Sequence, residues 1–263
     1  MNILFAFLVV SVLGLLLGAG LAVADKLLKV KKDEKLEKLE ALMPGANCGG
    51  CGFAGCSAYA AAVAEGTAKP GLCSPGGKAL AEKMGEIMSV AVEDSERKVA
   101  FVFCQGGKYL TKEDYIYQVI KDCNAASLLF QGPNACKEGC LHMGSCMAVC
   151  PVKAISYDEN GDVKVDKEKC VGCGACTKVC PNGVIKLVPY SAEYLVACNN
   201  HEAGGKAKKN CLKACIGCKM CVLKVENSPF TVDKFLSVND YSKDQSACPL
   251  AAEKCPQKCI VRR

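Results

Sequence analysis

The residues of this chain that could carry chemistry are its cysteines. The 263 residues include 22 Cys but only 2 His, so a metal would be held by thiolates, and soft sulfur ligands select iron–sulfur clusters, zinc or Cu(I). Aromatic residues make up 6% of the chain, which is little for domains that rest on hydrophobic cores alone. A secreted disulfide scaffold is the competing explanation, but such chains are usually short and do not repeat Cys-x-x-Cys followed by Cys-Pro.

The first cysteine motif lies in PGANCGGCGFAGC, where three cysteines fall within nine positions. A fourth follows after an alanine-rich, helix-like run. The glycines of the motif leave the backbone free to wrap a ligand and to point N–H groups at cluster sulfurs. A structural zinc site is the alternative. We predict one [4Fe–4S] cluster held by Cys48, Cys51, Cys56 and Cys73.

A second series of cysteines has the spacing of bacterial ferredoxins. The full run is Cys170-x2-Cys173-x2-Cys176-x3-Cys180-Pro181, and a wider run, Cys136-x3-Cys140-x5-Cys146-x3-Cys150-Pro151, precedes it. Because the fourth cysteine of each ferredoxin run ligates the other cluster, two clusters are predicted, one on Cys136, Cys140, Cys146 and Cys180 and one on Cys150, Cys170, Cys173 and Cys176. Zinc ribbons lack this crossing pattern. Two adjacent clusters pass electrons without bond chemistry, so no catalytic residue is expected.

The segment after Tyr194 is predicted to be a degenerate copy of this ferredoxin-like unit. Six cysteines recur 75 positions later without a gap, namely Cys123, Cys136, Cys140, Cys146, Cys173 and Cys180 as Cys198, Cys211, Cys215, Cys221, Cys248 and Cys255. The same offset replaces three ligands of one cluster, Cys150, Cys170 and Cys176, by Val225, Gln245 and Ala251. A single [4Fe–4S] cluster is therefore predicted on Cys215, Cys221, Cys255 and either Cys218 or Cys211. Cys218 is slightly favoured because it restores the usual Cys-x2-Cys-x2-Cys run, and the alternative is that the extra cysteines are vestiges.

The same tail also has the Cys-x3-Cys-x2-Cys spacing of radical enzymes that cleave S-adenosylmethionine, from Cys211 to Cys218. The barrel of that class needs on the order of 200 residues or more, and only a short tail follows. Cys104 comes after an apolar strand-like run, which favours a buried inert thiol, and Cys259 has no clear partner. His142 and His201 are isolated, so neither is predicted to be a ligand.

The start of the chain predicts a membrane anchor for these cysteine motifs. Residues 3–24 carry no charge and would span about 33 Å as a helix. A signal peptide is the alternative, but no basic residue precedes the run, which is longer than a usual signal core. Lys26, Lys29, Lys31 and Lys32 follow, so the positive-inside rule places the N-terminus outside and the cluster domains in the cytoplasm, at the cytoplasmic membrane.

These elements predict an α+β chain of small cluster-bearing domains. Its parts are a transmembrane anchor, a charged helical stalk on the membrane surface, a four-cysteine domain, a ferredoxin-like domain with a hairpin turn at Asn160-Gly161, and the degenerate repeat, at residues 1–25, 26–43, 44–100, 101–194 and 195–263. The net charge of +6 suits anionic membrane lipid or an acidic redox partner. The basic residues are dispersed with few aromatics, which argues against nucleic-acid binding.

The order of apolar helix, charged stalk, PGANCGGCGFAGC with a distant Cys73, and ferredoxin runs resembles the B subunits of Rnf complexes. The resemblance implies an ion-translocating ferredoxin:NAD⁺ oxidoreductase, in which such a subunit takes electrons from soluble reduced ferredoxin and relays them to integral membrane and flavin-bearing subunits. It implies no NAD or flavin on this chain, which also lacks a Gly-x-Gly-x-x-Gly turn after a predicted strand. The wide run from Cys136 to Cys146 and the cysteine-bearing tail depart from the usual pattern and leave the cluster number open, at three with a fourth in the tail. A membrane-tethered polyferredoxin that serves another reductase is the alternative function.

Overall fold

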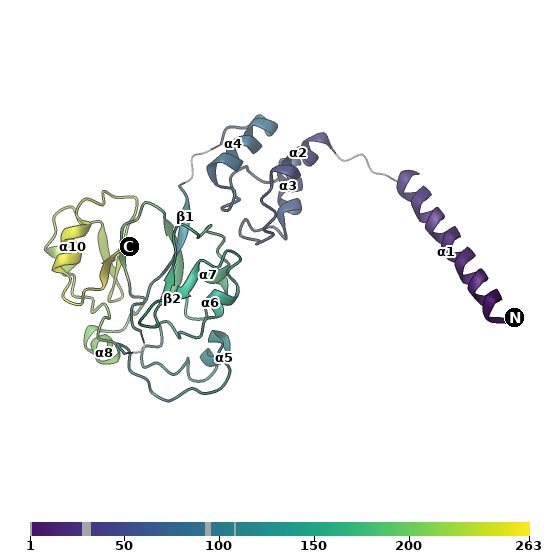
Figure 1. The fold of residues 1–263 in the computed structure, drawn as a ribbon. Helices are drawn as coiled ribbons and strands as arrows, with labels where there is room; N and C mark the ends of the chain where they lie inside the picture. Colours follow the sequence, from purple (N-terminus) through teal and green to yellow (C-terminus); the bar gives the residue numbers. More distant parts are fainter. Residues whose placement is uncertain (1, 28–32, 93–95, 108) are drawn as a thin grey trace.

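The computed structural model describes residues 2–27, 33–92, 96–107 and 109–263. Within these ranges the chain is a mixed α+β protein, with helices alone up to residue 88 and short antiparallel strand pairs joined by short helices after it. Figure 1 shows these parts in sequence order, from the long helix at the N-terminus to the strands at the C-terminus.

The first element is the apolar helix α1 (Asn2–Leu27). By length and composition, its segment Phe7–Ala24 is suited to cross a membrane. The side chains of Phe7, Leu15 and Leu21 are all more than 70% exposed, and a continuous apolar surface of this kind calls for an apolar partner such as lipid. The helix is therefore consistent with membrane anchoring. Of the basic residues that follow it, Lys29, Lys31 and Lys32 lie outside the described residues.

A helical unit, residues 34–88, follows. It contains α2 (Glu34–Leu42), α3 (Cys56–Ala64) and α4 (Gly77–Met88). Its core is built on Leu39, Tyr59 and Met84, whose side chains are at most 1% exposed. The sequence assigns α2 to a stalk, but the structure packs it against α3 and α4, because the apolar side of α2 finds its partner there through Leu39.

The central unit, residues 98–189, is built on two antiparallel strand pairs. Its strands are β1 (Lys98–Val102) with β4 (Ile185–Pro189), and β2 (Ile155–Tyr157) with β3 (Val163–Val165). Its short helices are α5 (Cys123–Ser127), α6 (Ser145–Ala148) and α7 (Ala175–Val179). The predicted turn between β2 and β3 is confirmed, with Gly161 at a positive φ of 80°. The expected domain boundary after residue 100 falls inside β1, because this strand pairs with the last strand of the central unit.

The C-terminal unit, residues 194–263, repeats this arrangement. Its strand pairs are β5 (Tyr194–Val196) with β8 (Ile260–Arg262), and β6 (Phe230–Asp233) with β7 (Leu236–Asn239). Its helices are α8 (Gly204–Asn210), α9 (Met220–Leu223) and α10 (Cys248–Lys254). The elements α9, β6 and β8 each begin 75 residues after α6, β2 and β4. The expected boundary after residue 194 falls inside β5.

The central and C-terminal units are joined along their backbones. Leu195 of β5 is fully buried in the core of the central unit. At the other end of the chain, the Arg263 side chain donates to the Ala100 carbonyl oxygen at 3.0 Å. A loop of the central unit pairs with the end of α8, since Lys112 N donates to Asn210 O at 3.0 Å and Leu212 N to Leu110 O at 3.0 Å. The central and C-terminal units therefore pack against each other.

Candidate iron–sulfur sites

The helical unit gathers four thiols in one pocket, lined by Cys48, Cys51, Cys56 and Cys73. Its loop turns through left-handed residues, with φ values of 44° at Asn47 and 65° at Gly49. The Asn47 side chain closes this loop by accepting the Cys56 N–H at 2.8 Å.

Tyr59 positions the approach to the last of these thiols, Cys73. Its hydroxyl donates to Lys69 O at 3.0 Å and accepts from Leu72 N at 3.1 Å. The ring is 1% exposed, so both hydrogen bonds are shielded from water. The chain before Cys73 is therefore held against α3, and four cysteines that the sequence predicts together lie together.

The first thiol group of the central unit comprises Cys150, Cys170, Cys173 and Cys176. Burial raises the pKa of Cys176 to about 12, and the other three thiols add to the shift. Two of the sulfurs accept backbone amides, Cys150 from Ala154 N and Cys170 from Ala100 N, both at 3.3 Å. This arrangement is common at iron–sulfur sites, where amide hydrogen bonds to sulfur tune the potential.

The second thiol group of the central unit differs from the ferredoxin pattern. Three of the expected cysteines line one pocket, but the fourth thiol there is Cys123 rather than Cys136. The reason is that Met143 replaces the middle cysteine of the Cys-x2-Cys-x2-Cys pattern between Cys140 and Cys146. The thiols in this pocket are Cys123, Cys140, Cys146 and Cys180.

Cys123 is fixed at the start of α5 by a short polar network. The Cys123 N–H donates to Ser145 Oγ at 2.7 Å, and the Ser145 hydroxyl donates to Asp122 Oδ2 at 2.7 Å. Asp122 also caps α5 by accepting from Ala125 N at 2.9 Å. Because Ser145 directly precedes Cys146, this network ties the two cysteine segments together. The missing middle cysteine is the signal from which Cys123 could have been found.

Cys136 lies in a different group, at the junction of the two strand-bearing units. Burial raises the pKa of its thiol to about 12, with contributions from Cys104, Cys198 and Cys211. The sequence favours an inert role for Cys104, but its sulfur accepts the Cys140 N–H at 3.4 Å. The structure therefore separates Cys136 from Cys146 and Cys180, with which the ferredoxin spacing groups it.

The C-terminal unit has its own thiol pocket, lined by Cys215, Cys218, Cys221, Cys255 and Cys259. Cys218 is the exposed member. Cys259, for which the sequence offers no partner, lies with its sulfur 3.5 Å from that of Cys255 and lowers the pKa of Cys255 by hydrogen bonding. Of the two candidates for the fourth ligand, Cys218 lines this pocket and Cys211 lies at the junction with Cys104 and Cys136.

The remaining candidates have other contacts. Cys248 is fully buried, and its thiol donates to Gln245 Oε1 at 3.3 Å. His201 Nδ1 lies 2.5 Å from Glu138 Oε2, and Tyr157 donates to the backbone oxygen of His142. The ring nitrogens of His142 are buried without a hydrogen-bond partner among the described residues.

These pockets fit iron–sulfur clusters by the chemistry of their donors. Each pocket offers at least four sulfur atoms, and in the central unit backbone amides are directed at the sulfurs of Cys140, Cys150 and Cys170, as at cubane clusters. Across the described residues, no group of three or more His, Cys, Asp or Glu side chains is placed to hold a single metal ion. Burial raises the pKa of Cys146 to about 11, and a bound cationic centre would stabilise the thiolate that ligation requires.

Comparison with known proteins agrees with this chemistry. A family model described as "Putative Fe-S cluster" matches residues 43–75, and the "4Fe-4S dicluster domain" matches residues 135–187. The B subunit of the Na(+)-translocating ferredoxin:NAD(+) oxidoreductase complex of Acetobacterium woodii is 39% identical over 96% of this chain and 75% of the relative.

Two further relatives are aligned over nearly their whole length. The B subunit of the ion-translocating oxidoreductase complex of Methanosarcina acetivorans is 36% identical over 97% of this chain and 96% of the relative. The B subunit of the proton-translocating ferredoxin:NAD(+) oxidoreductase complex of Clostridium ljungdahlii is 37% identical over 98% and 92%. The chain therefore belongs to the family of B subunits of Rnf ion-translocating oxidoreductase complexes, as their iron–sulfur electron-transfer subunit.

Proposed function

We propose that this chain relays electrons from reduced soluble ferredoxin to the integral membrane and flavin-bearing subunits of a ferredoxin:NAD⁺ oxidoreductase whose redox reaction drives ion transport. The observation that carries the proposal is a set of thiol groups in each of the three units, from the helical unit, which follows the apolar helix in sequence, to the C-terminal unit. The names of the relatives give ferredoxin as the electron donor and NAD⁺ as the final acceptor, and the thiol groups of this chain give the proposed path between them.

Four ligand sets follow from the thiol pockets. Each is proposed to hold one [4Fe–4S] cluster, which transfers single electrons without bond chemistry on the protein. The sets are Cys48, Cys51, Cys56 and Cys73; Cys150, Cys170, Cys173 and Cys176; Cys123, Cys140, Cys146 and Cys180; and Cys215, Cys218, Cys221 and Cys255. The fourth set makes the C-terminal unit a degenerate ferredoxin-like repeat that keeps one of its two clusters.

The helical unit contacts the central unit at its thiol group. Lys178 Nζ donates to Gly49 O at 3.4 Å, and a Cβ atom added at Gly50 would lie 2.5 Å from Cys173 O. Burial raises the pKa of Cys173, and the neighbouring thiol Cys48 of the helical unit adds to the shift. Within the central unit, Cys146 acts in the same way on Cys176. Neighbouring ligand sets therefore lie close enough for the charge on one set to affect the thiols of the next.

The C-terminal unit is the proposed entry point for electrons. Between residues 195 and 263 there are twelve Lys and Arg against six Asp and Glu, an excess equal to the net charge of +6 of the whole chain. Such a charge accelerates encounter with an acidic electron donor. Cys218 is exposed beside Lys219, which is exposed as well, so the cluster of this unit would lie close to a docked ferredoxin.

The opposite end of the series faces the membrane partners. We propose that α1 is a single membrane span with the N-terminus outside, which keeps all cluster units at the cytoplasmic surface among membrane lipids. The span Phe7–Ala24 contains no ionisable side chain, and ion movement through a membrane needs such groups. Ion translocation is therefore the work of other subunits, with which this chain exchanges electrons through the Cys73 cluster.

Stopped-flow reduction of the purified full chain by reduced ferredoxin tests the entry point. We expect Lys219→Glu combined with Lys224→Glu to slow the second-order rate at low salt, with the difference vanishing at high salt because the Debye length shortens. Lys83→Glu in the helical unit is the matched control and should leave the rate close to that of the unaltered chain. An equal effect of Lys83→Glu, or none from the double variant, would contradict docking at the C-terminal unit.

The relay itself is tested in the whole complex. We expect Cys73→Ala to abolish ferredoxin-dependent NAD⁺ reduction while the C-terminal unit is still reduced by ferredoxin. Retention of NAD⁺ reduction by this variant would exclude the proposed path. Purification without multi-span and flavin-bearing partners would favour a tethered polyferredoxin.

A further inference from the structure

We propose that Cys104, Cys136, Cys198 and Cys211 bind an additional [4Fe–4S] cluster at the junction between the central and C-terminal units. This inference rests on the proposed electron relay and completes it, because the site lies between the Cys140 and Cys215 ligand sets. The four cysteines are those left over once the other pockets are filled, apart from Cys248 and Cys259.

Each unit contributes an equivalent pair of cysteines to the junction. Cys104 lies two residues after the end of β1, and Cys198 lies two residues after the end of β5. Cys136 and Cys211 each stand four positions before the first cysteine of their unit's ligand run. In each unit, the segment after the opening strand supplies one thiol and the segment before the ligand run supplies the other.

The hydrogen bonds of the first pair of sulfurs repeat in the same way. Cys140 N donates to Cys104 Sγ at 3.4 Å, and Cys215 N donates to Cys198 Sγ at 3.3 Å. Amides directed at thiolate sulfur are the usual means by which a protein stabilises a bound cluster and tunes its potential. The same two amides belong to ligands of the adjacent sets, so the junction is linked directly to the pocket on either side.

Thiols of the two units approach each other across Gly106. A Cβ atom at this position would lie 2.4 Å from Thr111 Oγ1, 3.0 Å from Cys211 Sγ and 3.7 Å from Cys104 Sγ, so the two sulfurs both lie beside this glycine. The side chains of Cys136, Cys198 and Cys211 are 7–8% exposed, and Asn200, two residues after Cys198, directs its side-chain amide at Cys136 Sγ. The four thiols therefore lie at one largely buried junction between the two units.

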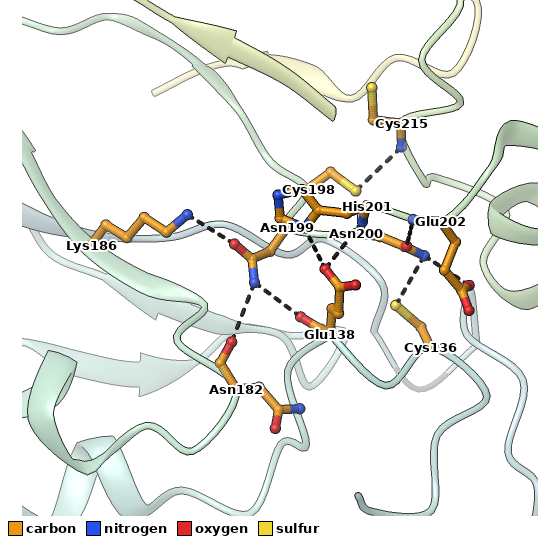
Figure 2. A network of polar contacts seen from close by, with 10 residues as sticks. All are labelled: Cys136, Glu138, Asn182, Lys186, Cys198, Asn199, Asn200, His201, Glu202 and Cys215. Carbon is orange, nitrogen blue, oxygen red and sulfur yellow. Dashed lines mark hydrogen bonds and ion pairs between the residues drawn. The ribbon is translucent and has the colours of Figure 1, made fainter. Parts of the chain in front are cut away.

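Polar contacts of segment 198–202 of the C-terminal unit cover the site. Figure 2 shows the segment 198–202 lying across the loop that carries Cys136. Asn200 is 2% exposed, and its Nδ2 donates to Cys136 Sγ at 3.4 Å and to Glu202 Oε2 at 3.4 Å. His201 N donates to Glu138 Oε2 at 3.1 Å, and this hydrogen bond attaches segment 198–202 to the central unit. A side-chain amide of one unit is thereby aimed at a sulfur of the other.

The neighbouring pockets explain why these four thiols are available. In the central unit Met143 displaces the middle ligand, and Cys123 completes that pocket. In the C-terminal unit Cys218 completes the run. The central pocket is therefore complete without Cys136, and the C-terminal pocket is complete without Cys211. A cluster at the junction connects the C-terminal cluster to the rest of the series and explains why a unit that has lost one of its own clusters keeps its electron path.

The test is a cluster count on the intact full-length protein, purified without oxygen, by native mass spectrometry and by iron and acid-labile sulfide analysis. Five clusters give about twenty irons per chain. We expect Cys104→Ala, Cys211→Ala and the double variant each to lose about four irons, since both residues hold the same cluster. Cys248→Ala is the matched control, a buried cysteine outside every thiol group, and should lose none.

The outcomes are distinct. About sixteen irons in the unaltered protein, or a loss of eight irons in the double variant against four in each single variant, would overturn the junction cluster. Zinc at one equivalent per chain without a fifth cluster would overturn it as well. Because the unaltered protein is counted directly, misfolding of a variant leaves the test valid. A chain with sixteen irons that still accepts electrons from ferredoxin would leave the proposed function standing and refute this inference alone.

Discussion

Replacement of Gly50 by alanine tests whether electrons cross directly from the helical unit to the central unit. Gly50 does not adopt a positive φ, so alanine fits its backbone. The added Cβ would nevertheless lie 2.5 Å from Cys173 O and 3.1 Å from Cys173 C. These are backbone atoms beside a proposed ligand, and they cannot rotate away as a flexible side chain would.

The magnitude follows from the overlap. Overpacking of this kind costs about 1–3 kcal/mol, which corresponds to a roughly 5- to 150-fold weaker association of the two surfaces. The four thiols of the helical unit keep their own pocket, so we expect the iron content to stay unchanged. The expected loss is in the magnetic coupling between the Cys48 and Cys173 clusters, measured by EPR on the reduced protein, and in the rate at which the two clusters equilibrate.

Gly205→Ala is the matched control for this substitution. Gly205 lies in α8 with no atom within 4 Å of an added Cβ, and alanine in a helix is more stable than glycine by roughly 0.5–1 kcal/mol. It should leave the coupling, rate and iron content unaltered. Unchanged coupling in Gly50→Ala would refute direct contact between the two clusters, and a loss of four irons would show that Gly50 serves the first pocket rather than the contact between units.

Three further substitutions or treatments test the ligand sets and their supports. Cys123→Ala should remove the cluster next to Cys146, seen as a loss of about four irons together with the coupling to the Cys176 cluster. Cys136→Ala should also lose about four irons, from the junction, but should keep this coupling, which the ferredoxin spacing predicts it to abolish. Tyr59→Phe should destabilise the helical unit by about 1–3 kcal/mol, because it leaves Lys69 O and Leu72 N without their buried partner; a thermal melt and an iron-release rate equal to those of the unaltered protein would show that the hydroxyl is dispensable. Removal of the clusters by a chelator should unfold the soluble units, since the free energy of metal binding at such sites is folding free energy, and a cluster-free chain that still melts cooperatively by circular dichroism would contradict this dependence.

The parts of the site that the sequence predicts are those with local spacing. Cys170, Cys173 and Cys176 share one turn-rich loop, so their separation along the chain dictates their separation in space. The same holds for Cys48, Cys51 and Cys56, where glycines allow the loop to close. The α+β character and the hairpin at Asn160-Gly161 follow from equally local patterns, and the structure shows both.

The parts that the sequence does not predict depend on contacts between distant segments. The offset of 75 residues pairs Cys123 with Cys198, but in the structure Cys198 occupies the place of Cys104, because strand pairing rather than numbering determines which loop faces which. The central unit has additional chain between β1 and α5, which shifts the numbering there. Cys136 fits the ferredoxin pattern by spacing alone. In the structure it lies at the junction, because the C-terminal unit packs against its loop.

The central claim is that the chain is an electron relay built on cluster-binding thiols. It is tested most directly by anaerobic titration of the purified full-length protein with reduced ferredoxin, followed by EPR and paired with iron and acid-labile sulfide analysis of the same sample. We predict about one electron accepted per four irons, with the signals of reduced [4Fe–4S] clusters. Zinc without acid-labile sulfide, or iron–sulfur clusters that ferredoxin does not reduce, would contradict it.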